Sequence, residues 1–210
     1  MTRALTPKGA ATRLKIIEGA AEEIRENGVA VTTLDDVRVR TRTSKSQLFH
    51  YFPEGKEELL LAVARYEAER VLSDQQPQLG ALTSWAAWQA WRDIVVDRYR
   101  RQGQYCPLNS LVSQLGRSTP GAQAVVTELV GQWQAEITAG VRHMQAIGEV
   151  DPALDAGRTA SSILAGVQGG VLLLLSTGHI GHLEAALDTS IEHLRRSRPA
   201  PAGGVAAHRG

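Results

Sequence analysis

The sequence contains little cysteine, phenylalanine or methionine, with one, two and two residues of these types among 210. A single cysteine excludes an internal disulfide bond. No apolar run follows a basic segment at the N-terminus, so we expect no secretion signal. The most apolar stretch, residues 163–175, is shorter than the roughly 20 residues that cross a membrane, and it contains Gln168. We therefore expect a cytoplasmic protein with no membrane partner, in which this stretch is a buried helix.

The charges almost cancel, and the formal net charge is +1 at pH 7. Residues 1–56 carry ten Lys and Arg against seven Asp and Glu, while the rest of the chain carries thirteen against fifteen. This mild basic excess does not identify a nucleic-acid-binding protein, because phosphate contacts depend on where charges lie more than on their total. The function must be inferred from motifs.

Residues 33–60 have the layout of two short helices, a tight turn and a longer anchoring helix. Thr33 can cap a helix whose first turn holds Asp35 and Asp36, where the helix dipole favours negative charge. Ser44 is a second candidate for an N-cap. This pattern predicts a helix-turn-helix.

The helix after Ser44 has an apolar side and a polar side. We expect Leu48, Phe49 and Phe52 to anchor it in a small core, with Val31 and other apolar residues around them. The polar side carries donors and acceptors suited to DNA, namely Lys45, Ser46, Gln47, His50 and Tyr51.

Over residues 10–65 the chain resembles the TetR family of bacterial transcriptional repressors. The resemblance rests on the order of Thr33, an acidic pair, Ser44-Lys45, the run Leu-Phe-His-Tyr-Phe at 48–52, and Lys-Glu-Glu-Leu at 56–59. It implies an all-α fold with an N-terminal three-helix DNA-binding domain. A larger C-terminal helical domain for ligand binding and dimerisation would follow, paired with a second copy through its last two helices.

Two departures from the family pattern stand out. Thr41 and Arg42 replace a small residue and a glycine in the turn, and a positive φ at Arg42 would cost about 1 kcal/mol relative to glycine. Gly55 is an extra residue before Lys56. Together with residues 105–111, which include Cys106 and Pro107, it resembles the LmrA/YxaF-like branch of the family.

Periodicity and capping signals predict helices along the rest of the chain. We divide the chain into a DNA-binding domain over residues 1–56, ordered from about residue 10, a ligand-binding and dimerisation domain over 57–196, and a disordered tail over 197–210. Within them, helices are expected over residues 14–27, 85–100, 107–116, 120–147, 155–176 and 182–196.

Roles in DNA binding follow from side-chain chemistry. Gln47 can pair with adenine through both amide atoms, and Lys45 can reach guanine or phosphate. Lys56 lies at a helix N-terminus, a position that suits a phosphate. Thr33 and Ser44 serve as caps or as phosphate contacts, and both possibilities stay open. The complete set of expected DNA contacts is Thr33, Arg42, Thr43, Ser44, Lys45, Ser46, Gln47, His50, Tyr51 and Lys56.

The last two helices carry a broad apolar stripe, which predicts a homodimer. Gly166, Gly169 and Gly170 lie inside a helix, where glycine costs roughly 1 kcal/mol, and another helix could approach closely there. A dimer would place two recognition helices about 34–36 Å apart on a palindromic double-stranded DNA operator.

Aromatic residues concentrate in the second domain and predict a site for a small-molecule effector. Each tryptophan alone could be core, but the set resembles the wall of a pocket for a planar aromatic or amphipathic compound. The expected ligand-binding residues are Trp88, Trp91, Tyr99, Asn109, Trp133, His143, Met144 and Gln168. An effector that releases the operator would make the protein a ligand-responsive repressor.

Other functions are weighed against this one. A transcriptional activator fits the same motifs, and a DNA-binding architectural protein without a ligand would lack the pocket. An enzyme with Cys106 as nucleophile and His143 as base is disfavoured, because Pro107 removes a backbone donor that such a site would use. His179 and His182 form no complete metal site. We expect no catalysis, no cofactor and no metal.

Overall fold

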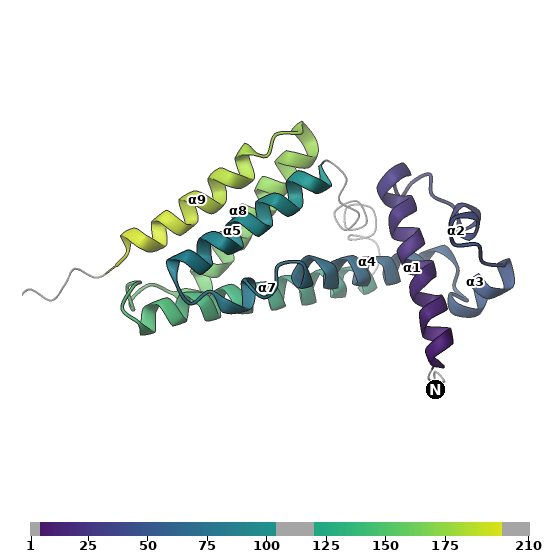
Figure 1. Ribbon diagram of the computed structural model, residues 1–210, viewed down its shortest axis with the longest axis horizontal. Coiled ribbons are helices and arrows are strands. Elements are labelled where there is room, and N and C mark those ends of the chain that lie inside the picture. Colours follow the sequence, from purple (N-terminus) through teal and green to yellow (C-terminus); the bar gives the residue numbers. More distant parts are fainter. Residues whose placement is uncertain (1–4, 104–119, 199–210) are drawn as a thin grey trace, which may run out of the picture. The chain divides into compact units, whose positions relative to one another are not determined.

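The computed structural model describes residues 5–103 and 120–198, which form eight α-helices, one short 3-10 helix and no strand (Figure 1). The predicted all-α fold is confirmed. The helices are α1 (Pro7–Asn27), α2 (Leu34–Thr41), α3 (Lys45–Tyr51), α4 (Lys56–Ser73), α5 (Trp85–Gln102), α7 (Pro120–Ala146), α8 (Ala156–Thr177) and α9 (Gly181–Arg196), with the 3-10 helix η1 at Leu79–Ala81.

The chain folds into two compact units. The first comprises Met1–Asp74 and Gln102–Gln132, and the second comprises Gln75–Arg101 and Trp133–Gly210. Helix α7 therefore contributes its first half to one unit and its second half to the other. The domain division expected at residue 56 does not coincide with these units and stays a prediction about function.

Helix α1 begins earlier than predicted. The hydroxyl of Thr6 accepts a hydrogen bond from the backbone N–H of Gly9 at 3.2 Å, and Pro7 occupies the first helical position, where its missing N–H costs nothing. Gly28, with φ +85°, ends the helix. Lys8, which precedes the start expected for the ordered domain, is thus helical.

Three helices, α1 to α3, enclose the predicted small core, and α4 packs against α1. Leu48 and Phe52 have no exposed surface, as expected for anchors of α3. Val31 and Phe49 were predicted in this core, and that prediction is wrong because both are exposed. The buried apolar residues of α1 to α3 and their loops are Ile16, Ile17, Ala20, Ala21, Ile24, Val29, Val37, Leu48 and Phe52.

Polar contacts also join α1 to α4. Glu67 of α4 is buried, and its carboxylate lies 3.3 Å from Arg25 of α1 and 3.6 Å from Arg70. The hydroxyl of Tyr66 donates to Glu18 of α1 at 3.3 Å, and burial raises the pKa of Tyr66. A buried carboxylate that lost its partner would destabilise the fold strongly, so these contacts fix α4 on α1.

In the second unit, α5, α8 and α9 lie side by side (Figure 1). Arg92 of α5 makes a two-armed pair with Asp188 of α9, with distances of 2.8 and 2.9 Å, and these hydrogen bonds raise the pKa of Arg92. Arg100, two turns further along α5, pairs with Glu184. These two arginines define the register between α5 and α9.

Helix α8 is long and apolar enough, by length and composition alone, to cross a membrane. Eight of its residues are buried, and it packs along α9. Gly170 permits this packing, since a Cβ there would lie 2.5 Å from the Cα of Leu183, whereas one at Gly166 would make only an ordinary contact of 3.4 Å with the Cβ of Ala186. The predicted buried helix is therefore a core helix of this unit.

Residues 74–78 form a turn that leads directly into η1 at Leu79–Ala81. Residue 198, expected in a disordered tail, pairs with Glu149 at 3.1 Å through its guanidinium. The expected helix over residues 107–116, together with Cys106 and Asn109, lies outside the described residues, as does the tail from residue 199.

Replacing Gly170 by alanine should destabilise the protein by about 1–3 kcal/mol, because the new Cβ meets the backbone of Leu183, which cannot move without shifting α9. The matched control is Gly131→Ala on the exposed side of α7, where no described atom lies within 4 Å. That change should stabilise by about 0.5–1 kcal/mol. Urea unfolding of both variants measures the difference, and equal effects would contradict the close crossing of α8 and α9.

Candidate nucleic-acid interface

Helix α2 begins with a reciprocal cap. The backbone N–H of Asp36 donates to the Thr33 hydroxyl at 3.2 Å, and the backbone N–H of Thr33 donates to the Asp36 carboxylate at 2.8 Å. Hydrogen bonds from Thr33 lower the pKa of Asp36. This capping box satisfies two helix-end donors at once. Thr33 therefore acts as a cap, one of the two roles that its sequence position allowed.

The turn after α2 has a positive φ at Arg42, the conformation whose cost was considered from the sequence. This residue has φ 51° and ψ 44°, the left-handed conformation that usually takes glycine. Its backbone N–H donates to the carbonyl of Val39 at 3.3 Å. The hydroxyls of Thr41 and Thr43 lie 2.8 Å apart and are buried. Thr43 was expected to contact DNA, but the structure places its side chain inside the turn.

A second capping box begins α3. The backbone N–H of Gln47 donates to the Ser44 hydroxyl at 3.1 Å, and the backbone N–H of Ser44 donates to the side-chain carbonyl of Gln47 at 2.9 Å. Ser44 is thus a cap, as Thr33 is. Because the carbonyl oxygen of Gln47 is engaged, only its NH2 group is available to a base edge. Two-armed pairing with adenine would require the capping box to open.

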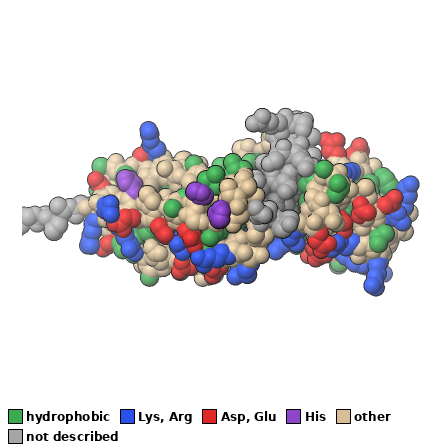
Figure 2. Space-filling model, turned by 90° about the horizontal axis from the view of Figure 1, so that it is seen from above, with side chains coloured by type: hydrophobic (Ala, Val, Ile, Leu, Met, Phe, Trp, Pro, Cys, Tyr) green, Lys and Arg blue, Asp and Glu red, His purple; other side chains and the backbone are tan. Residues whose placement is uncertain are grey.

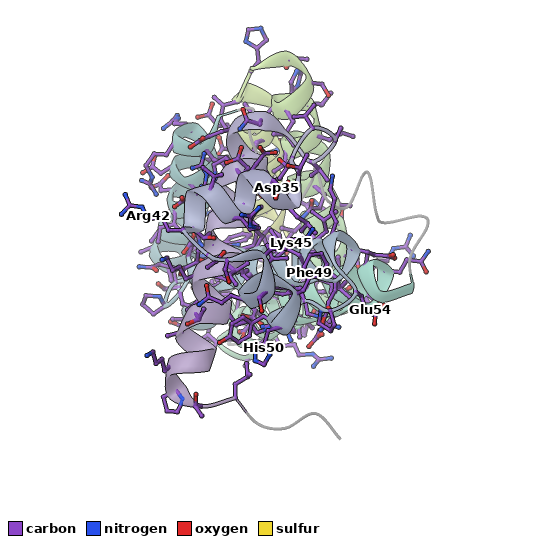
Figure 3. The ribbon with its side chains drawn as sticks, turned by 90° about the vertical axis from the view of Figure 1, so that its right-hand side faces the viewer. Asp35, Arg42, Lys45, Phe49, His50 and Glu54 are labelled. Carbon is purple, nitrogen blue, oxygen red and sulfur yellow. The ribbon has the colours of Figure 1, made fainter. Side chains whose placement is uncertain are left out.

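The exposed side of α3 matches the predicted polar side closely. Lys45, Ser46, Gln47 and His50 are exposed, and Tyr51 is half-buried. The rings of His50 and Tyr51 pack edge to face with centroids 4.8 Å apart. Figure 3 shows Arg42, Lys45, Phe49 and His50 on one side of the first unit. This side presents polar donors together with the apolar ring of Phe49.

The basic side chains of α2 and α3 fall into two groups. Arg40 pairs with Glu23 at 2.6 Å and with Glu26, and these hydrogen bonds raise the pKa of Arg40 while lowering that of Glu26. Arg38 pairs with Asp35. Arg42 and Lys45 form no ion pair with any described residue, so their charges are available to an external anion.

Lys56 does not lie as the sequence suggested. Its ammonium group donates to the carbonyl of Val29 at 3.4 Å, and its charge also helps to lower the pKa of Asp36. The side chain is half-buried against the loop between α1 and α2. Lys56 therefore ties α4 to this loop in the DNA-free protein, and a phosphate contact would have to replace that bond.

Three of the four tryptophans of the second unit are buried, which fits both a core role and a pocket role, while Trp85 is half-buried. Trp88, Trp91 and Trp133 have no exposed surface, and the first two pack edge to face with centroids 5.9 Å apart. The indole N–H of Trp91 donates to Gln75 at 2.8 Å. Those of Trp88 and Trp133 are buried and have no hydrogen-bond partner among the described residues. Two buried donors therefore lack an acceptor within the described part of this unit.

Other expected ligand-binding residues are placed differently. Met144 and Tyr99 are buried, but His143 of α7 and Gln168 of α8 are exposed, so they line no interior site in the single chain. Figure 2 shows histidine side chains at the surface of the second unit. Among residues 5–103 and 120–198, no three His, Cys, Asp or Glu side chains are close enough to hold a metal ion.

A hollow of about 390 Å³ opens between α8 and α9, away from these tryptophans. Sequence reasoning did not find it, because no local signal marks a groove between two helices. It is lined by Leu154, Asp155, Arg158, Thr159, Ser162, Ile163, Thr189, Ser190 and His193.

Two substitutions of Gln47 test its capping role and the role of its NH2 group separately. Gln47→Glu keeps an acceptor for the Ser44 N–H and should leave the free energy of unfolding unchanged. Gln47→Ala should lower that free energy by about 1 kcal/mol. Duplex DNA is the ligand expected from the sequence, and the affinities for it should follow a different order. Wild type should bind most tightly and Gln47→Ala less tightly. Gln47→Glu should bind most weakly, because its carboxylate repels phosphates.

Urea unfolding and electrophoretic mobility shifts measure the two orders. Wild-type affinity in Gln47→Glu would show that the NH2 group makes no contact with DNA.

Two family models match the chain. The one described as "Bacterial regulatory proteins, tetR family" matches residues 16–63, which include α2, the turn and α3. The other, "Tetracyclin repressor-like, C-terminal domain", matches residues 83–190, just over half of the chain.

Individual proteins agree with these matches. An HTH-type transcriptional regulator of Lactococcus lactis is 25% identical over 185 residues, covering 84% of this chain and 90% of that protein. A TetR transcriptional regulator of Chloroflexus aurantiacus is 26% identical, with a TM-score of 0.74 over 90% of this chain and 96% of that chain. A TetR regulatory protein of Rhodobacter sphaeroides has the same TM-score at 20% identity, over 87% and 98%. The LmrA/YxaF-like branch stays a prediction, but the chain belongs to the TetR family of DNA-binding transcriptional regulators.

Proposed function

We propose that this regulator is a cytoplasmic repressor that binds a palindromic operator as a homodimer and releases it when a small effector binds. The observation that carries the proposal is the capped, outward-facing helix α3, with unpaired cations beside it. In this proposal residues 1–56 bind DNA, and residues 57–196 bind the effector and pair with a second copy.

The contacts with DNA divide by chemistry. Arg42 and Lys45 bind phosphate, because their charges have no partner in the described chain and a phosphate contact releases counterions. Gln47 donates its NH2 group to an acceptor on a base edge in the major groove. His50 and Tyr51 hold the DNA backbone near the end of α3. Thr33 and Ser44 position these groups by capping their helices.

A dimer through α8 and α9 explains an exposed apolar surface. Leu172 is 56% exposed and Leu173 is also exposed on α8, while Gly169 has no described atom within 4 Å of its Cβ position. Such leucines on an otherwise well-packed helix favour burial against another protein surface. A second copy of the same pair of helices supplies a matching surface with twofold symmetry.

Leu172→Glu should convert the dimer into a monomer, because the carboxylate would be buried in the interface. In a selection on random duplex DNA, wild type should enrich an inverted repeat. The variant should enrich a single half-site and bind the full operator about 100-fold or more weakly, since the second half-site no longer adds avidity. Light scattering gives the oligomeric state and sequencing gives the enriched site.

The matched control is Ile147→Glu, which changes a residue that is 51% exposed just beyond α7. It should stay dimeric and keep the inverted repeat. If the wild-type protein is monomeric at micromolar concentration, the proposed dimer is wrong. If the selection enriches no sequence, the proposed operator binding is wrong.

The effector binds among the buried aromatic residues of the second unit and carries a hydrogen-bond acceptor. Three observations support this: the edge-to-face pair of Trp88 and Trp91, the complete burial of Trp133 and Met144, and the two indole N–H groups without a partner among the described residues. A buried donor without an acceptor costs about 1–3 kcal/mol, which a ligand with a carbonyl or ring nitrogen could recover.

Planar compounds with an acceptor, such as quinoline, should quench tryptophan fluorescence more strongly than naphthalene, which has none. They should also weaken operator binding about 5- to 150-fold, the usual range of allosteric coupling. Trp133→Phe should reduce the preference for quinoline over naphthalene, because it deletes one of the two donors without a partner among the described residues. Trp85→Phe is the control, since the Trp85 N–H already donates to Glu149 at 2.9 Å.

Fluorescence titration tests ligand binding, and mobility shifts with the same compounds test release of the operator. Quenching without operator release would refute regulation by these ligands, and absence of quenching across a broad panel would refute the site.

A further inference from the structure

Phe49 is a large apolar side chain exposed on α3. It is 40% exposed, although the sequence pattern predicted it in the core beside Leu48 and Phe52, which have no exposed surface. Residues three and four apart on a helix are neighbours, so Phe49 shares its side of α3 with Lys45 and Ser46. Figure 3 shows Phe49 close to Lys45 on the side that carries Arg42. The ring therefore lies within the surface assigned to DNA.

The ring is held from behind and open in front. Its Cε1 lies 3.7 Å from where a Cβ of Gly55 would be, and Leu34 Cδ1 lies 3.9 Å from the same point. Gly55 has φ +74° and carries no side chain, so one edge of the ring can rest against this position. A partly packed ring has fewer rotamers to lose on binding, which favours a specific contact.

We propose that Phe49 recognises the 5-methyl group of a thymine in each operator half-site. A phenyl ring has no hydrogen-bond donor or acceptor, so it cannot recognise the polar edges of the bases. The thymine methyl is the apolar group that the major groove presents, and aromatic contact with it is an established means of sequence recognition. The inference rests on the proposed operator binding and names one base feature that this binding requires.

According to this proposal, operator affinity depends on the 5-methyl group itself, on thymine or on 5-methylcytosine alike. Deoxyuridine keeps the hydrogen-bonding groups of thymidine and lacks only the methyl, whereas 5-methylcytosine restores the methyl on a different base. Burial of one methyl group corresponds to about a four-fold change in affinity. Symmetric substitution in both half-sites should therefore change affinity about 15-fold.

The experiment replaces each thymine of the selected operator in turn by deoxyuridine, in both half-sites, and measures the affinity ratio between the two duplexes. Wild type should show one position with a ratio of about 15. At that position cytosine should bind weakly, and 5-methylcytosine should recover part of the affinity. Phe49→Ala should reduce the ratio to about one, because the group that contacts the methyl is absent.

Val39→Ala is the matched control, because Val39 is 77% exposed on α2 and its loss also removes exposed apolar surface. This variant should keep the wild-type ratio. Each ratio compares two duplexes with one protein preparation, so partial unfolding of Phe49→Ala cancels. No methyl-dependent position in wild type, or an unchanged ratio in Phe49→Ala, would overturn the proposal while leaving operator binding intact. Absence of any sequence preference would overturn both.

Discussion

The capping box between Ser44 and Gln47 is the interaction on which the DNA-binding surface depends. Helix α3 has only seven residues and would not be stable alone. The cap sets where it begins, and burial of Leu48 and Phe52 sets which side faces inward. Once the first residue of α3 and its inward-facing side are fixed, Lys45, Gln47 and Phe49 must point outward. One side chain, Gln47, therefore belongs both to the scaffold and to the surface proposed to bind DNA.

Charge pairing sorts the basic residues nearby into structural and available groups. Arg38 and Arg40 are neutralised by carboxylates of α1 and α2, whereas Arg42 and Lys45 have no ion-pair partner among the described residues. Arg42 also holds a left-handed conformation that glycine would adopt without cost. An arginine at this position therefore needs a benefit that offsets the conformational cost. Its accessible positive charge, next to the start of α3, provides that benefit. The small net charge of the chain is thus compatible with a locally basic surface.

The sequence predicted the features that neighbouring residues determine. Both caps depend on contacts within three residues, and both were found, while the positive φ of Arg42 lies in the turn where the sequence departs from the family pattern. The buried or exposed state of single residues was less predictable. Phe49 and His143 occupy apolar or aromatic patterns that looked interior, yet α4 and the rest of each unit leave them at the surface. The bond from Lys56 to Val29 joins residues 27 apart and has no local signal.

The second unit contains a source of energy of the size that regulation needs. An indole N–H buried without an acceptor costs about 1–3 kcal/mol, and coupling between effector and DNA typically amounts to about 1–3 kcal/mol. Trp88 and Trp133 each present such a donor, while Trp91, next to Trp88, is satisfied by Gln75. A ligand that supplies an acceptor would gain this energy only in the conformation that places the indole against it. Differential affinity for one conformation is what an effector needs to shift the population of the protein.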